Sequence, residues 1–202
     1  MWMNNATVLD PEPSQEDRVA ALAAQLSDGD LKAVRVQFAS LGAAGPALLW
    51  QPAAEDIAPA QLRFLLTHWN RLRGAERFAR ADRIDPLEMR PALGYINMLD
   101  PVDEGRDFRF RLFGSAIAAA AEFDLTGELM SEGKIAPFLM EYELALHRAV
   151  FKRGEPALTS LTPPASLSQA TWHKLVLPLA DESGAIVRML TGVVPVTHRA
   201  DS

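Results

Sequence analysis

Hydrophobic positions recur at helical spacing in two segments near the start of the chain. The first begins at Ser14, and Asp17 follows three residues later. This pair is typical of a helix N-terminus, because the two side chains can bond the free backbone N–H groups of the first turn. The second segment covers about 30–41 and also has one apolar side. Residues 42–56 break the pattern with Gly and Pro, so we expect a linker there.

Four further segments have helical patterns. One opens at Pro59 and has a wide apolar face. Asp85 and Pro86 are typical of a helix start, and that short helix is expected to end near Gly94. An alanine-rich helix follows Gly114, and a longer one is predicted over 137–152. The apolar face of the helix after Pro59 consists of Leu62, Leu65, Leu66, Trp69 and Leu72.

Alternating polar and apolar positions predict strands in the second half of the chain. The segments are 95–102, 107–114, 171–180 and 185–196, with a further candidate at 155–162. Short polar connections, 103–105 and 181–184, join them into two hairpins. Hairpins separated by helices predict an α+β fold, in which helices flank one antiparallel sheet. The strand over 171–180 is partly apolar on both faces, so we expect N-terminal helices or a partner subunit to cover its second face.

The composition excludes several kinds of chemistry. The chain has 202 residues and no cysteine. Disulfides, thiolate nucleophiles, Cys-ligated zinc, iron–sulfur clusters and a cysteinyl-flavin adduct are therefore impossible. The net charge of −6 argues against a nucleic-acid partner. No apolar run is long enough for a membrane span, and the first residues lack the features of a signal peptide, so we expect a cytoplasmic protein.

Five short motifs occur in a characteristic order from Trp69 onward. They are WNRLRG, IDPLEMRPALGYINMLD, DFRFRLFGSAI, DLTG and KLVLPLADESG. The series resembles a bacterial PAS subfamily with I-D-P-x-x-M, D-F-R-x-R-L-x-G-[ST] and D-L-T-G motifs, and it covers roughly residues 60–196. One departure is that Ala121, Glu122 and Phe123 stand where such sequences usually have an aromatic residue and Gly. The resemblance implies a PAS-like domain over 56–198, preceded by an N-terminal helical extension and linker over 1–55.

A small-molecule cavity is one expectation for the apolar side of such a domain. Residues of this kind at core spacing are more often plain core, and that alternative stays open. His173 is included because it alternates in phase with Leu175 and Leu177. The candidate ligand-binding residues are Met98, Phe110, Phe113, Tyr142, Trp172, His173 and Met189.

The histidines do not predict a metal site. His68, His147, His173 and His198 are the only ones, and no two have ligand-like spacing. Some members of the wider PAS fold bind haem through a histidine, for which His147 is the candidate here. Because it directly follows Leu146, the two side chains point in different directions. We expect a solvated or capping histidine and no required cofactor.

No catalytic residue is predicted. Asp85, Asp100 and Asp124 lie beside prolines, turns or helix starts, where aspartate bonds backbone N–H groups. Arg109 and Arg111 share one strand face and are expected to form surface ion pairs.

The resemblance implies a stand-alone sensory or regulatory module that acts through protein–protein contacts, with or without a small ligand. It also implies a homodimer, for which the apolar face from Leu62 to Leu72 is the expected interface. One alternative is an enzyme with a cone-shaped pocket, as in ketosteroid-isomerase-like proteins, with His173 and Tyr142 as the nearest acid–base candidates. A ligand-free structural adaptor with a filled core is the other alternative.

Overall fold

A computed structural model describes residues 13–197, so His198 lies outside the described residues. Its centre is a seven-stranded sheet in the order β1-β5-β6-β7-β3-β4, with β2 beside β6. All pairings are antiparallel except the parallel pair β2–β6. The strands are β1 (Ala44–Trp50), β2 (Ala79–Arg80), β3 (Ile96–Val102), β4 (Asp107–Leu112), β5 (Ala157–Thr162), β6 (Ala170–Ala180) and β7 (Ile186–Thr197). The helices are α1 (Gln15–Ser27), α2 (Lys32–Ser40), α3 (Ala60–Arg73), α4 (Ser115–Ala121) and α5 (Pro137–Arg153).

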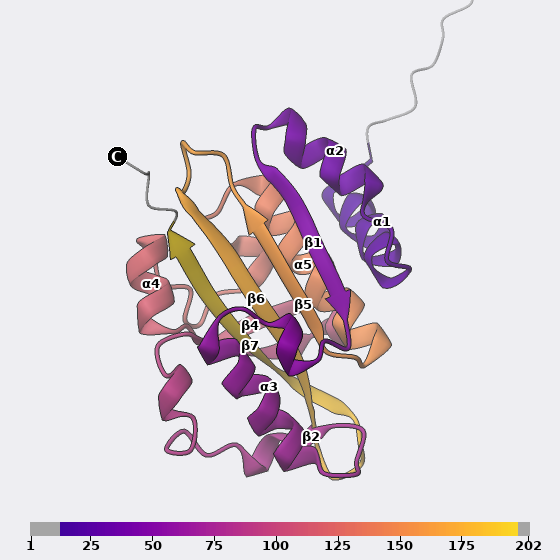
Figure 1. Cartoon of the computed structure of the whole chain (residues 1–202). Helices are drawn as coiled ribbons and strands as arrows, with labels where there is room; N and C mark the ends of the chain where they lie inside the picture. Colours follow the sequence, from indigo (N-terminus) through magenta and orange to yellow (C-terminus); the bar gives the residue numbers. More distant parts are fainter. Residues whose placement is uncertain (1–12, 198–202) are drawn as a thin grey trace, which may run out of the picture.

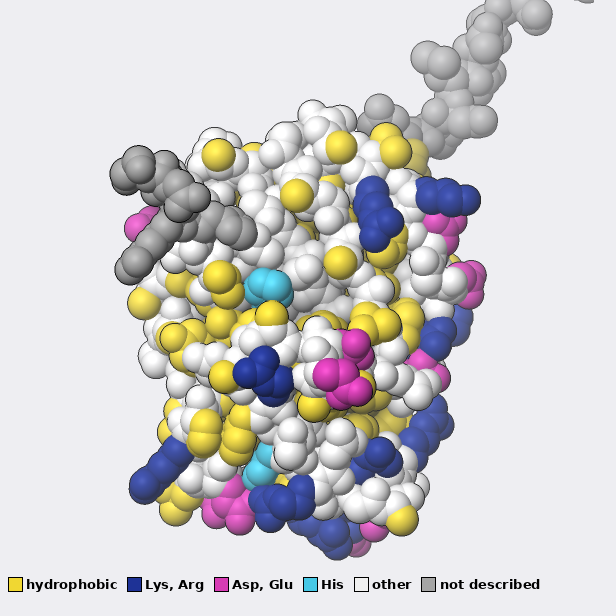
Figure 2. All heavy atoms as spheres, viewed as in Figure 1, with side chains coloured by type: hydrophobic (Ala, Val, Ile, Leu, Met, Phe, Trp, Pro, Cys, Tyr) yellow, Lys and Arg dark blue, Asp and Glu magenta, His cyan; other side chains and the backbone are white. Residues whose placement is uncertain are grey.

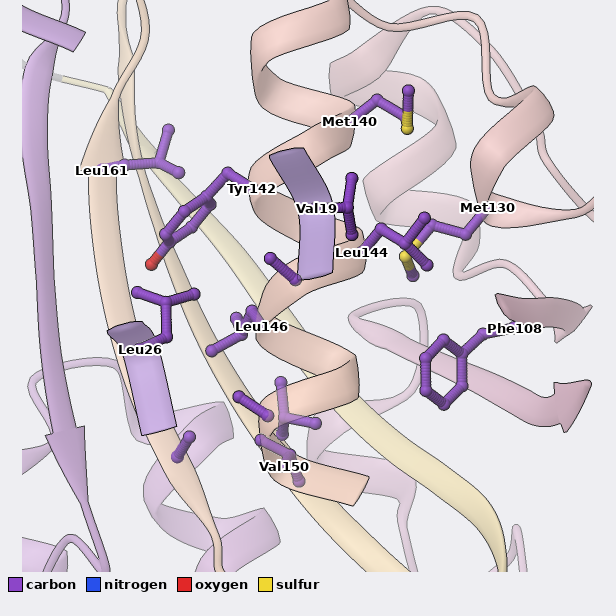
Figure 3. Close-up of a cluster of buried hydrophobic side chains, with 14 of the residues drawn as sticks. Val19, Leu26, Phe108, Met130, Met140, Tyr142, Leu144, Leu146, Val150 and Leu161 are labelled. Carbon is purple, nitrogen blue, oxygen red and sulfur yellow. The ribbon is translucent and has the colours of Figure 1, made fainter. Parts of the chain in front are cut away.

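Helices cover both faces of this sheet. In Figure 1, α3 lies in front of the strands, and α5 lies behind them with α1. Each side has its own cluster of buried hydrophobic residues. The α5-side core joins α1, α2, α5 and the rear of the sheet, and Figure 3 shows Val19 and Leu26 beside Leu144 and Leu146. The α3-side core packs α3 against Leu175, Leu177 and Leu179 of β6.

The predicted α+β fold is confirmed, and so are most of its elements. All five strand segments and both hairpins form. At the start of α1, Ser14 Oγ accepts the Asp17 N–H at 3.2 Å, and an Asp17 carboxylate oxygen accepts the Ser14 N–H at 3.1 Å. α5 begins at Pro137 and ends at Gly154, which has a left-handed backbone conformation. Local patterns were sufficient for these elements because each one carries its own boundary residues.

The expected linker over 42–56 is wrong, because it contains strand β1. This strand lies at the edge of the sheet and pairs with β5, with Leu48 opposite Thr159. Pro46 is tolerated there because an edge strand has one side without ladder partners, and the register shifts between Ala44 and Ala47. Gly and Pro here mark an irregular edge strand.

The short helix predicted from Asp85 is also wrong. Residues 86–89 form a turn, with i→i−3 hydrogen bonds from Glu88 N to Asp85 O and from Met89 N to Pro86 O. A 3₁₀ turn, η3 (Arg90–Ala92), follows. Pro91 explains the difference, because it has no N–H to continue an α-helix and its ring clashes with the preceding turn.

The N-terminal extension packs closely on the rest of the chain. Arg18 of α1 forms an ion pair with Glu141 of α5 at 2.6 Å, and Glu16 pairs with Arg148 at 2.7 Å. The ring of Phe38 on α2 lies edge-on to Tyr142, with centroids 5.5 Å apart. α5 is therefore enclosed between the sheet and the extension. Within residues 13–197, no helix is long and apolar enough to cross a membrane.

Candidate ligand cavity

A cavity of about 740 Å³ lies on the α5 side of the sheet. Its walls are α4, the segment 122–136, the first half of α5 and the adjoining parts of β4, β6 and β7. The lining is mainly apolar and includes Phe110, Phe113, Ile117, Leu125, Met130, Leu139, Leu161, Trp172 and Val193. This size falls within the range of about 300–1,000 Å³ typical of small-molecule sites.

α4 is held against the sheet by a very close backbone contact. The carbonyl of Gly94 accepts the N–H of Ala116 at 3.0 Å and that of Ile117 at 3.3 Å. A Cβ on Gly114 would lie 2.3 Å from the same carbonyl oxygen, much closer than atoms can approach. Only glycine therefore fits at this position of the D-F-R-x-R-L-x-G-[ST] motif. The close contact positions α4 as one wall of the cavity.

The D-L-T-G turn connects the outer wall to β4. Asp124 Oδ1 accepts hydrogen bonds from the backbone N–H of Thr126 at 2.8 Å and from its hydroxyl at 2.7 Å. These bonds lower the pKa of Asp124. Thr126 Oγ1 accepts the N–H of Phe113 at 3.2 Å. Asp124 thus has the structural role expected of it, and the turn positions Phe113 in the cavity wall.

Glu122 occupies the departure from the family pattern. It ends α4 in the left-handed conformation, with φ 63° and ψ 21°. Glycine adopts this conformation without steric cost, whereas glutamate does not. The next residue, Phe123, fills part of the cavity wall, with its ring centroid 5.9 Å from that of Phe113. The turn geometry is therefore kept despite the different residue.

Three of the seven predicted ligand-binding residues line the cavity. Phe110 and Phe113 come from β4 and the residue that follows it, and their ring centroids lie 5.4 Å apart. Trp172 comes from β6, and its Nε1–H donates to Ser168 Oγ at 3.1 Å. These three aromatic side chains lie on different parts of the wall, so they enclose the same space.

The other four predicted residues lie elsewhere. Tyr142 is fully buried in the α5-side core, where its hydroxyl is 2.6 Å from Thr159 Oγ1. Burial raises its pKa. Met189 belongs to the same core, and Met98 packs against the α3-side core. Tyr142 and Met189 have the apolar spacing of the cavity residues but are fully buried in the core, and Met98 is half-buried on the α3 side of the sheet.

His173 is on the opposite face of the sheet from the cavity. Successive residues of a strand point to opposite faces, and Trp172 and Lys174 line the cavity. His173 therefore lies on the side of Leu175, which packs in the α3-side core. The sequence correctly predicted that His173 points to the same face of the strand as Leu175 and Leu177. That face, however, packs against α3 and not against the cavity.

The sequence interpretation missed three polar residues of the cavity. Lys174 of β6 and Glu143 of α5 form an ion pair, and Asn97 of β3 lines the same cavity. The amide oxygen of Asn97 accepts the N–H of Gly114 at 3.0 Å. One sequence pattern indicated Lys174, since it alternates in phase with Trp172. Which residues of α5 and β3 meet it depends on tertiary packing.

His147 is buried rather than solvated, which corrects the expectation for this residue. It lies between α5 and the sheet, where Nδ1–H donates to the Glu143 carbonyl at 2.8 Å and Nε2 accepts from the Thr191 hydroxyl at 3.2 Å. Both ring nitrogens are thus engaged, so a haem iron would have to replace one of these bonds. Burial lowers the pKa of His147 to about 4.

We predict that His147 makes the protein less stable in mild acid. The unfolded chain binds a proton at His147 near pH 6.5, whereas the folded chain binds one only near pH 4. Its contribution to the free energy of unfolding is therefore complete above pH 6.5 and decreases as the pH falls, by about 2 kcal/mol between pH 7 and pH 5. Urea denaturation of the wild type and of His147→Gln at both pH values measures this, because the two proteins carry the same carboxylates. Equal pH dependence in both proteins would refute the prediction.

The predicted interface residues are covered by the chain itself. Leu62, Leu65, Leu66 and Trp69 are buried, and Leu72 is half-buried. A Cβ on Gly192 of β7 would lie 2.5 Å from Leu62 Cδ2, so α3 lies directly against the backbone of the sheet. This face packs on the sheet, which leaves four of its five side chains without exposed surface for a second copy.

The other charged candidates have structural contacts. Asp85 Oδ1 accepts the N–H of Leu87 at 2.8 Å. Asp100 pairs with Arg111 at 3.2 Å and with Arg188 at 2.7 Å. Arg109 donates to the carbonyl of Gly127 at 2.8 Å, and it forms no ion pair with any residue of the described part, 13–197. Among residues 13–197, no three His, Asp or Glu side chains are grouped closely enough to hold a metal ion.

Comparison with known protein families identifies the family of this chain. A family model described as a PAS domain matches residues 57–194, about two thirds of the chain. The protein therefore belongs to the PAS domain family, and the match includes α3, β2 to β6, most of β7 and all of the cavity lining except Pro195 and Thr197. A search of curated proteins found no match to the chain.

Proposed function

We propose that this PAS-domain protein is a regulatory module that responds to a small, largely apolar molecule bound in the cavity. Membership of the PAS family suggests a sensory or regulatory role. The observation that carries the proposal is the cavity itself, with its apolar walls and few polar groups. A filled core would instead have favoured the structural adaptor.

The outer wall is the part that responds to the ligand. α4 is anchored at its start by Gly94, and the D-L-T-G turn is anchored to Phe113. A ligand that binds one arrangement of this wall better than another shifts the population toward it. The change then reaches the surface through α4 and residues 122–136.

A protein partner and a homodimer are part of the same proposal. Large hydrophobic side chains remain exposed on the described surface, among them Val36 of α2 and Leu49 of β1. Figure 2 shows hydrophobic side chains gathered over the middle of the α3 side, with charged ones along its lower edge. Exposed apolar area of this kind supports a protein contact. Because Trp69 and its neighbours are buried, a dimer would have to use other residues.

We propose a binding function without catalysis. The acid–base pair of the enzyme alternative, Tyr142 and His173, lies on opposite faces of the sheet. The Tyr142 hydroxyl is bonded to Thr159 and lies outside the cavity lining. These positions favour the regulatory module over a ketosteroid-isomerase-like enzyme.

Native mass spectrometry tests the proposed function. We expect the wild type to retain a small molecule that is released on denaturation, and the same spectrum reports the number of subunits. Val193 lies on the cavity floor, so Val193→Phe fills part of the space and should abolish the extra mass. Leu87→Phe, at an exposed position outside the cavity, is the matched control and should retain it. Bare chains for the wild type would favour the structural adaptor, and equal retention in both variants would place the bound molecule outside this cavity and refute the proposed site.

A further inference from the structure

The polar groups of the cavity restrict the chemical class of its ligand. We infer that the ligand is an uncharged molecule with an apolar body and a carbonyl group that accepts a hydrogen bond from Asn97. This inference rests on the proposed function, because it concerns the same cavity. It follows from the ion pair of Lys174 and Glu143, the charges on the rim, and the amide of Asn97.

The ion pair in the wall disfavours a charged ligand. The side chains of Lys174 and Glu143 are only 13% and 16% exposed, and both line the cavity. A ligand carboxylate that bound Lys174 would leave Glu143 without its partner, and a ligand ammonium that bound Glu143 would do the same to Lys174. An unpaired buried charge is strongly unfavourable, so either exchange costs binding energy. An uncharged ligand leaves the pair intact.

The charged residues at the rim of the cavity do not favour a ligand of either charge. Two further charged side chains line the cavity, Glu122 and Lys134, and both are exposed. Their charges are opposite, so together with the ion pair they contribute no net charge to the lining. Exposed charges are also well screened by solvent, which limits their effect on a bound molecule.

Asn97 provides a hydrogen-bond donor for the ligand. Its amide oxygen is used by the Gly114 N–H, so the NH₂ group is the end that remains. The residue is only 6% exposed, and within residues 13–197 the structure gives this NH₂ group no acceptor. This amide nitrogen is not among the fully buried atoms that lack a partner, so it borders the open space of the cavity, where a carbonyl oxygen of the ligand can accept its hydrogen bond. The aromatic walls at Phe110, Phe113 and Trp172 accommodate the apolar body.

Three probes of equal chain length test the charge preference. Octanamide, octanoate and octylamine are uncharged, negative and positive at pH 7, and their binding is measured by isothermal titration calorimetry on the full chain. We expect octanamide to bind at least tenfold more tightly than either charged probe. Tighter or equal binding of octanoate or octylamine would overturn the inference but leave the cavity as a ligand site. No binding of any probe to the wild type at 1 mM would count against the proposed function itself, and the inference would fall with it.

Single substitutions in the ion pair should reverse the preference. Glu143→Gln leaves Lys174 unpaired, so octanoate should gain at least tenfold in affinity. Lys174→Met leaves Glu143 unpaired, so octylamine should gain instead. Glu132→Gln and Lys152→Met make the same charge changes at exposed positions outside the cavity and serve as matched controls. Equal gains in the controls would overturn the inference. If an ion-pair variant does not fold, the comparison of the three probes on the wild type still tests the preference for an uncharged ligand.

Asn97→Asp tests the carbonyl contact. The variant keeps an oxygen for the Gly114 N–H and places a second oxygen where the NH₂ group was. We expect 2-nonanone, whose carbonyl can accept but not donate a hydrogen bond, to bind at least tenfold more weakly to this variant than to the wild type, with circular dichroism confirming that the variant is folded. Unchanged affinity in the folded variant would refute the assigned role of Asn97.

Discussion

Replacing Trp69 by alanine is expected to lower the free energy of unfolding by about 3–5 kcal/mol, without changing the number of subunits. Trp69 is 3% exposed, and it packs in the α3-side core. Its Nε1–H donates to the carbonyl of Pro178 at 2.9 Å, and the Arg73 guanidinium lies 5.2 Å from the ring centre. The substitution removes a large buried side chain and leaves the Pro178 carbonyl without this donor. Urea denaturation followed by circular dichroism measures the loss, and light scattering after size exclusion reports the subunit number.

Trp69→Phe is the matched variant for this prediction. It keeps an aromatic ring in the core but removes the hydrogen bond to Pro178, so its loss should be clearly smaller than that of alanine. An unchanged free energy of unfolding in Trp69→Ala, together with a dimer that becomes a monomer, would refute the assignment. That result would place Trp69 at a subunit interface instead of between α3 and the sheet.

Gly114→Ala is expected to destabilise the protein by about 3 kcal/mol, although it adds only one methyl group. The added Cβ would lie 2.3 Å from the Gly94 carbonyl oxygen and 2.9 Å from that of Ile96. Both atoms belong to the backbone, so they cannot move aside as a side-chain end would. The start of α4 must shift away from β3, which also stretches the bond from Gly114 to Asn97. Chemical denaturation gives the stability loss, and octanamide titration reports the displaced cavity wall.

Ser115→Ala provides the control for Gly114→Ala. Ser115 is the next residue, it begins α4, and its side chain is exposed. Its substitution should change the free energy of unfolding by no more than about 0.5 kcal/mol. Similar losses in the two variants would show that α4 tolerates the extra methyl group, and that the close contact with Gly94 is not what requires glycine.

The five predicted strands could be recognised from local sequence because polar and apolar residues alternate along them. Alternation along β4 and β6, together with polar connections of three and four residues, identifies hairpins from local sequence alone. The same holds for α1, whose capping residues Ser14 and Asp17 lie only three positions apart. Pro137 correctly indicated the start of a helix, whereas the effect of Pro91, which prevents one, was missed.

β1 was missed because its partner is more than 100 residues away. The segment AGPALLW has weak local preference for a strand, and it becomes one by pairing with β5, where Leu49 lies opposite Leu158. Long-range pairing of this kind can override local preference, since the ladder hydrogen bonds depend on a strand that the local window does not contain. The expected linker failed for that reason.

The cavity was only partly predictable. Apolar spacing identified Phe110, Phe113 and Trp172, but it also selected Tyr142 and Met189, whose surroundings are filled. Apolar residues that surround a space and apolar residues that pack together have the same sequence pattern. Whether such a residue lines a cavity depends on how far the neighbouring helix stands from the sheet.

The chain's own sequence was enough to indicate its elements, its α+β class and, through five ordered motifs, its resemblance to PAS domains. It also placed Gly114 between a strand and an alanine-rich helix, but only the structure shows that the Gly94 carbonyl requires glycine there. Only the tertiary structure shows which face of each strand packs against α3 and which packs against α5. It therefore placed His173 away from the cavity and brought Lys174, Glu143 and Asn97 to its wall. The physical reason is that periodicity defines two faces of an element, whereas only packing decides what each face meets.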